Sequence, residues 1–281
     1  MEVDNALVQP AQLYTPQALL DWLDKNAIGR GWVSVPPFVY RQQLDRAAAA
    51  KWASYLNDGL LDLCNAHASR LSPVFHLPVE HPALAAEIAS HWTAKGQHRF
   101  AMPAGAGQDV MLSDSAYEPL WKTLDAASAF LLLHPQDSTD ARHGPFYLKN
   151  LFGNPYETAV AAAHLTFSRV PERFPQIKIC LAHGGGLTAI VAGRFDRGLV
   201  TKRPGVEPTM TPPSQIMARL YADSILHDPN ALTLAGQVFG ASHILFGSDW
   251  PYPMGLPDPH AQLANVDAAF RAKILSNADA V

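Results

Sequence analysis

Residues 177–186 read IKICLAHGGG, an apolar run that ends on His183 and continues directly into three glycines. A short run of this kind is typical of a strand that is buried on both faces, as in a parallel sheet. Glycine leaves room beside the backbone that the side chains of other residues would fill. The segment therefore predicts a buried strand with a titratable ring at its end. It also predicts that another group comes close to the backbone behind that ring.

Seven other short apolar runs are separated by longer segments with helical patterning. These runs cover residues 31–35, 73–77, 99–102, 129–134, 219–224 and 243–248, with a weaker one at 2–7. Strands that alternate with helices pair in parallel, and no GxGxxG follows the first run, which disfavours a dinucleotide-binding sheet. Eight such units predict a single-domain α/β fold, a (β/α)8 TIM-type barrel over residues 1–281 with an incomplete or atypical first strand.

The composition restricts the possible partners. Hydrophobic residues make up 48% and charged residues 16%, and the net charge of −4 involves no run of either sign. A nucleic-acid footprint would need clustered Lys and Arg, and a membrane helix would need about 18 consecutive apolar residues. We therefore expect neither partner. The N-terminal residues lack the features of a signal peptide, and we expect a cytoplasmic protein in which Cys64 and Cys180 are free thiols.

Three of the apolar runs end on a residue that can bind a metal or move a proton. His134 ends the run 129–134, His183 ends the run 177–183, and Asp249 directly follows the run 243–248. The active site of a barrel lies at the carboxyl ends of its strands, and a buried polar group without a partner costs about 1–3 kcal/mol. Imidazole and carboxylate groups that converge there suit a divalent metal such as zinc, or an acid–base pair.

Four motifs occur in an order and spacing that resemble one enzyme superfamily. They are LLLHPQD (131–137), CLAHGGG with AGRFDRG (within 180–198), YADSILHDP (221–229) and LFGSDWPYPMG (245–255). From about Thr15 onward the chain is similar to the amidohydrolase superfamily, and within it to the amidohydrolase-related branch that resembles aminocarboxymuconate-semialdehyde decarboxylase. The resemblance implies a (β/α)8 barrel with one divalent metal, usually zinc, and no organic cofactor. It also implies non-oxidative decarboxylation of a small unsaturated or aromatic carboxylic acid.

The resemblance also assigns roles to individual residues. His134 and Asp249 would be metal ligands, and His183 would be the catalytic acid–base residue, with its glycines leaving space for the substrate. Arg194 would bind the substrate carboxylate in the active site of the neighbouring subunit of a homodimer.

Four further residues are expected at the substrate pocket. Tyr147 stands roughly where the family carries an aromatic residue that lines the pocket, and His227 lies in the motif of the seventh strand. Phe38 and Trp250 belong to loops that follow predicted strands, and we place both in the pocket wall.

One family motif is not present in this chain. The family begins with a strand that ends in D-x-H-x-H, and here Asp4 fits its start while the histidine positions fall on Ala6 and Val8. Three explanations stay open: residues missing from the chain as given, an altered metal site, or loss of catalysis. Two alternative functions follow, a metal-dependent hydrolase of a lactone, ester or amide on the same barrel, or a non-catalytic barrel.

Overall fold

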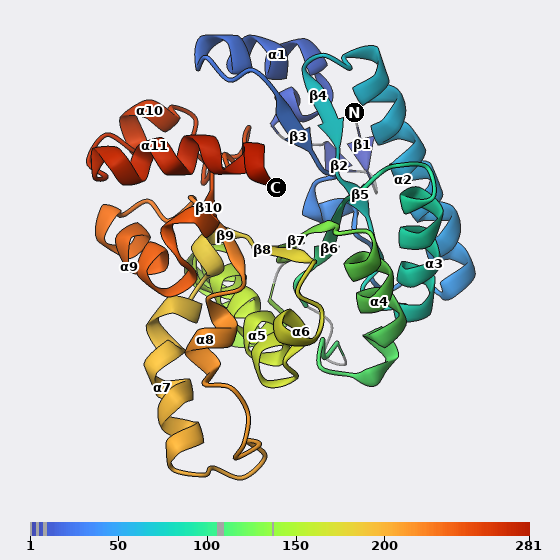
Figure 1. The fold of residues 1–281 in the computed structure, drawn as a ribbon. Helices are drawn as coiled ribbons and strands as arrows, with labels where there is room; N and C mark the ends of the chain where they lie inside the picture. Colours follow the sequence, from blue (N-terminus) through green and yellow to red (C-terminus); the bar gives the residue numbers. More distant parts are fainter. Residues whose placement is uncertain (1, 4–5, 8–9, 106–109, 137) are drawn as a thin grey trace.

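The computed structural model describes residues 2–3, 6–7, 10–105, 110–136 and 138–281 (Figure 1). At the N-terminus, β1 (Glu2–Val3) and β2 (Ala6–Leu7) pair with each other in an antiparallel hairpin. The run at 2–7 was predicted to join the parallel barrel, and that prediction is wrong for the described residues. The reason is local: Asp and Asn, which favour turns, divide the run into two-residue pieces. Asp4 and Val8 lie outside the described residues.

The other seven predicted runs all contain strands, and every pairing among them is parallel. One sheet has the order β10-β9-β8-β7-β6-β5, and a second consists of β3 and β4. Only Val74 separates β4 from β5, so one stretch of chain connects the two sheets. The strands are β3 (Gly31–Val33), β4 (Leu71–Pro73), β5 (Phe75–His76), β6 (Arg99–Pro103), β7 (Phe130–His134), β8 (Lys178–Leu181), β9 (Tyr221–Asp223) and β10 (Ile244–Leu245). This α/β arrangement confirms the predicted fold class.

Helices cover the outside of the strands (Figure 1). They are α1 (Pro16–Lys25), α2 (Arg46–Ala66), α3 (Pro82–Thr93), α4 (Glu118–Ala126), α5 (Asn154–Phe167), α6 (Val170–Arg173), α7 (Thr188–Val200), α8 (Pro213–Met217), α9 (Pro229–Phe239), α10 (Pro259–Gln262) and α11 (Ala268–Ser276). The longest helix, α2, begins after Asp45, whose carboxylate accepts hydrogen bonds from the backbone N–H groups of Ala47 and Ala48. This is a standard way to satisfy the free donors at a helix start. No helix among the described residues is long and apolar enough to cross a membrane.

Alternate residues of each strand face opposite sides of the sheet. In β7, Leu131 and Leu133 pack outward in the large core that the helices cover. Phe130 packs instead with Cys180 and Leu245 in a smaller cluster inside the barrel, with Trp32 at its edge. This second cluster faces away from the large core, as the alternation of side chains along β7 requires.

The described strands β10 and β3 do not pair, and side chains connect these two edges instead. Trp22 of α1 stacks on Trp250, which follows β10, with ring centroids 5.8 Å apart. Its Nε1 donates a hydrogen bond to the carbonyl of Pro257 at 2.9 Å. The ring of His260 also bonds the carbonyl of Asn26 at 2.8 Å. Both cysteines are free and buried, as predicted.

Candidate functional site

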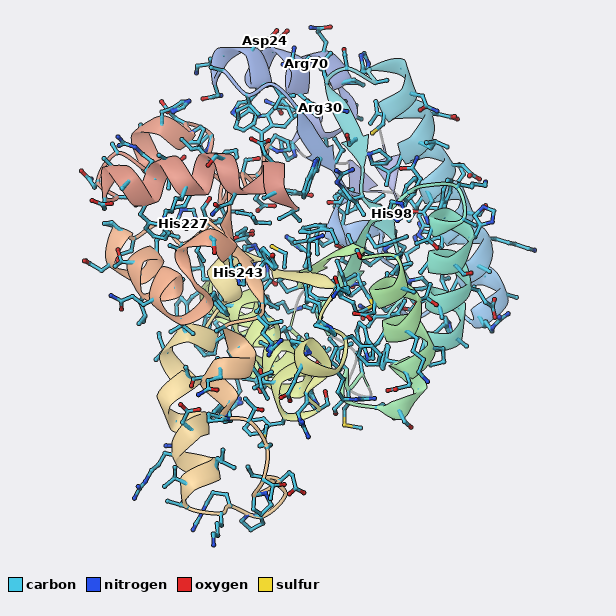
Figure 2. All side chains as sticks on the ribbon, viewed as in Figure 1. Asp24, Arg30, Arg70, His98, His227 and His243 are labelled. Atoms are coloured by element: carbon cyan, nitrogen blue, oxygen red, sulfur yellow. The ribbon has the colours of Figure 1, made fainter. Side chains whose placement is uncertain are left out.

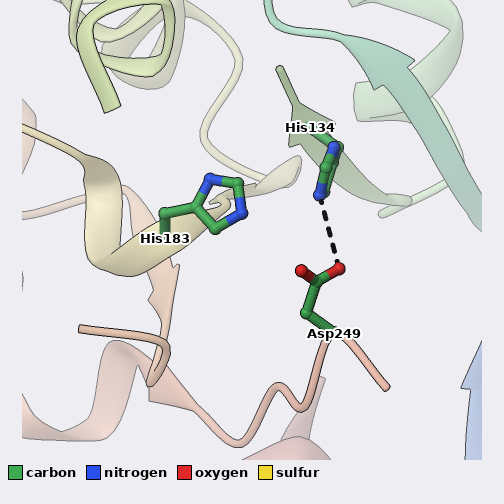
Figure 3. Close-up of side chains that lie close together, drawn as sticks. All are labelled: His134, His183 and Asp249. Atoms are coloured by element: carbon green, nitrogen blue, oxygen red, sulfur yellow. Dashed lines mark ion pairs between the residues drawn. The ribbon is translucent and has the colours of Figure 1, made fainter. Parts of the chain in front are cut away.

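His134, His183 and Asp249 lie together beyond the carboxyl ends of β7, β8 and β10 of one sheet (Figure 3). His134 is the last residue of β7, His183 follows β8 by two residues, and Asp249 follows β10 by four. One ligand atom from each residue lies within 4.8 Å of those of the other two. Figure 2 shows His227 and His243 on the side of the molecule formed by the C-terminal helices, away from His98.

The hydrogen bonds of His134 determine which of its two ring nitrogens has a free lone pair to bind a metal. Its Nδ1 lies 2.8 Å from the carbonyl of Pro135, an oxygen that can only accept, so Nδ1 carries a hydrogen. The other nitrogen, Nε2, faces Oδ1 of Asp249 at 3.8 Å. Burial opposes a charge on the ring, but the Asp249 carboxylate, the Pro135 carbonyl and Asp223 together raise the pKa of His134. The position between the two side chains therefore favours a positive charge.

A divalent cation would fit between these two groups. Zinc lies about 2.0–2.2 Å from imidazole nitrogen and carboxylate oxygen, so two ligands of one ion are at most about 4.3 Å apart. The observed 3.8 Å between His134 and Asp249 is within this limit. The Nδ1 atom of His183 is buried and has no hydrogen-bond partner among the described residues. The donor set present therefore fits a divalent metal.

Asp223 holds the His183 loop in place. Its carboxylate is buried and accepts hydrogen bonds from the backbone N–H groups of His183 at 2.9 Å, Gly184 at 2.8 Å and Ile225 at 3.0 Å. Burial raises the pKa of Asp223 in spite of these three donors. Because the carboxylate faces backbone donors, Asp223 positions His183.

The His183 ring is neutral in this environment. Burial, followed by the neighbouring His134, lowers its pKa to about 3. The residue has a positive φ of 55°, in the left-handed region that non-glycine residues rarely occupy. A neutral imidazole keeps a nitrogen lone pair that can accept a hydrogen bond or a proton.

The three glycines after His183 make room for the chain itself. A Cβ atom added to Gly184 would lie 2.2 Å from Leu226, and one added to Gly186 would lie 2.1 Å from the carbonyl oxygen of Pro155. Gly185 would similarly meet the ring of Phe239 at 2.7 Å. The prediction that these glycines leave space for a substrate is therefore wrong, because α5, α9 and the loop after β9 already occupy that space.

Two tyrosines, the buried Tyr40 and the half-buried Tyr252, interact electrostatically with Asp249. Tyr40 is 2% exposed and stacks on His76, with ring centroids 5.1 Å apart. Burial and then the Asp249 carboxylate raise the pKa of both Tyr40 and Tyr252, so both phenols stay protonated. Tyr252 was not predicted from the sequence, although its place three residues after Asp249 in the same loop is a usable signal. Phe38, which was predicted, is 40% exposed near Tyr40 in the chain.

The remaining predicted residues lie outside the His134–His183–Asp249 cluster. Tyr147 is 64% exposed and acts electrostatically on Tyr252. His227 is exposed, contributes to the lowered pKa of His183, and lines a separate cavity of about 230 Å³ beside α9 and α10. The Trp250 ring packs against α1, and Arg194 is exposed on α7. Their roles in substrate binding stay predictions.

Comparisons with known proteins give the following similarities. The family model Amidohydro_2, described as amidohydrolase, matches residues 35–279. The 2-amino-3-carboxymuconate-6-semialdehyde decarboxylase of Dictyostelium discoideum is 24% identical over 249 residues, which cover 86% of this chain and 68% of the relative. The protein of the same name from Caenorhabditis elegans is 35% identical over 132 residues, or 46% of this chain and 33% of that relative.

A solved structure has the same fold. It is a dihydroxybenzoic acid decarboxylase from Polaromonas sp. JS666, with bound manganese and the inhibitor 2-nitroresorcinol. Its TM-score is 0.81 at 23% identity, and the match covers 98% of this chain and 86% of that chain.

Proposed function

Because this chain belongs to the amidohydrolase family, as its motifs predicted, we propose that it is a metal-dependent carboxy-lyase. The proposed reaction is the non-oxidative removal of CO₂ from a small aromatic or unsaturated carboxylic acid. The observation that carries this proposal is the convergence of His134, His183 and Asp249 at the carboxyl ends of the strands. The decarboxylase names of the relatives support the same reaction class.

His134 and Asp249 are the proposed metal-holding residues. His134 presents Nε2 because its Nδ1 is bonded to the Pro135 carbonyl. When bound, a divalent cation supplies positive charge that orients the substrate carboxylate and stabilises negative charge that develops during the reaction. Zinc is the ion that we propose, with manganese as the first alternative because the related solved structure contains it.

His183 is the proposed proton-transfer residue. Its neutral ring accepts a proton from a substrate hydroxyl or a water molecule and delivers it to the carbon that bears the carboxylate. The carbon–carbon bond then breaks, CO₂ leaves, and the bonding electrons restore the double bond or aromatic ring that accepted the proton. A proton from solvent replaces the one that a substrate hydroxyl gave up. The hydrogen bonds that Asp223 accepts from the backbone of the His183 loop keep the ring at the reacting centre.

The proposal also covers the residues that bind the substrate and the assembly of two chains into a homodimer. Tyr147, Phe38, Trp250 and His227 would line or approach the pocket, and Arg194 would reach the site of a neighbouring subunit in a homodimer. The exposure of Arg194 on α7 is compatible with that role. The whole chain, residues 1–281, would form one domain.

Metal content and CO₂ release test this function together. The purified chain is analysed for zinc and manganese, and its CO₂ release is measured with a panel of aromatic and unsaturated carboxylic acids. We expect about one divalent metal per chain, because His134 and Asp249 form one site, and CO₂ release from at least one acid. His134→Ala should lose both, whereas His91→Ala, at an exposed position on α3, should keep both.

The result that would contradict the proposal is a native chain that takes up no zinc or manganese when these are offered. Hydrolysis of a lactone, ester or amide without CO₂ release would instead assign the same site to a hydrolase.

A further inference from the structure

Two arginines that act electrostatically on each other lie at the amino ends of the strands, opposite the end that carries His134. Arg30 directly precedes β3, and Arg99 is the first residue of β6. Phe100 packs in the large core under the helices, so the side chain of Arg99 faces the inside of the barrel. There its guanidinium lies over the ring of Trp32, 4.6 Å from the centroid. Two positive charges thus meet at this end of the barrel.

No carboxylate in the described part of the chain neutralises these two charges. Neither Arg30 nor Arg99 forms an ion pair with a described residue, whereas Arg70, which directly precedes β4, pairs with Asp24 at 2.7 Å. Figure 2 shows Arg30, Arg70 and Asp24 at the same edge of the molecule. Burial and then the charge of Arg30 lower the pKa of Arg99. Like charges held close together repel each other, and an anion between them would remove that repulsion.

The two arginines also leave most of their hydrogen-bond donors unused among the described residues. Arg99 donates a hydrogen bond to none of them, and Arg30 uses only Nη2, which lies 3.3 Å from the carbonyl of Ala68 and 3.3 Å from Oγ of Ser72. The Ser72 hydroxyl accepts there and keeps its own hydrogen for another acceptor. Arg30 is exposed and Arg99 half-buried, so a small ligand can reach both. A guanidinium presents a planar fork of donors that matches two oxygens of one anion.

We propose that Arg30, Arg99 and Ser72 form a second binding site, at the amino ends of the strands, for a phosphate group. A phosphate group carries about two negative charges at neutral pH, which match the two guanidiniums, and its oxygens can accept from all three side chains. A monocarboxylate would balance only one of the two charges. The site lies at the other end of the barrel from His134 and Asp249, and it does not depend on the proposed decarboxylase function.

Titration calorimetry of the full chain with inorganic phosphate tests this site. We expect the native chain to bind phosphate, and His134→Ala to bind it as well, which separates this site from the proposed metal site. Arg99→Met and Arg30→Met should each weaken binding by at least about tenfold, because each removes a charge-assisted donor. Arg197→Met, at an exposed position on α7, is the matched control and should bind phosphate as the native chain does.

Melting curves show whether a loss of binding arises from a loss of folding. Without phosphate, Arg99→Met should melt at the native temperature or above it, since one of two repelling charges is gone. Saturating phosphate should raise the melting temperature of the native chain and of Arg197→Met, but not that of the two other arginine variants. Phenyl phosphate in the same titration distinguishes two sources of the ligand. Tighter binding than inorganic phosphate indicates a phosphate monoester, and equal or weaker binding indicates free phosphate.

Two results would overturn the site. One is a native chain that binds no phosphate in the titration. The other is phosphate binding that both Arg99→Met and Arg30→Met keep at native strength, which would place the anion elsewhere; if His134→Ala alone abolished it, that place would be the proposed metal site.

Discussion

Replacement of Gly186 by alanine distinguishes two explanations of the glycines after His183. Gly186 has φ 59° and ψ −127°, a backbone conformation that other residues avoid. The added Cβ would lie 2.1 Å from the Pro155 carbonyl oxygen and 2.9 Å from its carbon, so that backbone atoms would have to move. Strained backbone costs about 1–3 kcal/mol and overpacking about 1–3 kcal/mol more.

The expected destabilisation of Gly186→Ala is therefore about 2–6 kcal/mol. At about 2–4 °C per kcal/mol, the melting temperature should fall by at least about 4 °C. Differential scanning calorimetry of the metal-free chain measures this fall without any substrate. Gly193→Ala is the control: it lies within α7 with open space at its Cβ position, and alanine is favoured there by about 1 kcal/mol.

If the Gly186→Ala variant melts at the native temperature and loses only substrate affinity, the packing explanation is refuted. The glycines would then serve the substrate, as the sequence alone had led us to expect.

Two further predictions concern Asp223 and Asp45. Asp223→Asn should lower kcat while the metal content is retained, because an amide cannot accept all three backbone hydrogen bonds that orient the His183 loop. Asp62→Asn, at an exposed position on α2, is the control. An equal loss of kcat in this control would contradict the role of Asp223. Asp45→Ala should lower the melting temperature at neutral pH. The backbone N–H groups of Ala48 and Ala47 lower the folded pKa of Asp45, so this stabilisation is present above the unfolded value of about 3.9 and is lost as the pH falls through the lower folded pKa. Melting curves between pH 7 and pH 3 should therefore converge for the two chains, and a gap that widens with acid would contradict the assignment.

The local sequence was sufficient to predict most of the strands and the positions of the polar residues that follow them. A buried parallel strand needs a short apolar run, and His134 and Asp249 are visible in the sequence because they follow such runs. The strand predictions at 31–35 through 243–248 succeeded for this reason. The run at 2–7 did not, because a weak apolar pattern cannot distinguish a hairpin from a barrel strand.

Only the tertiary structure decided which atoms meet. The distance between His134 and Asp249, the three donors on Asp223 and the approach of Arg30 to Arg99 each depend on segments that are far apart in the sequence. The glycines show the difference most directly. Their sequence indicated a close approach to the backbone, but only the packing revealed that α5, α9 and Leu226 make that approach. Hydrophobic periodicity is a property of one segment, whereas contacts of a few ångströms arise from the register and packing of several.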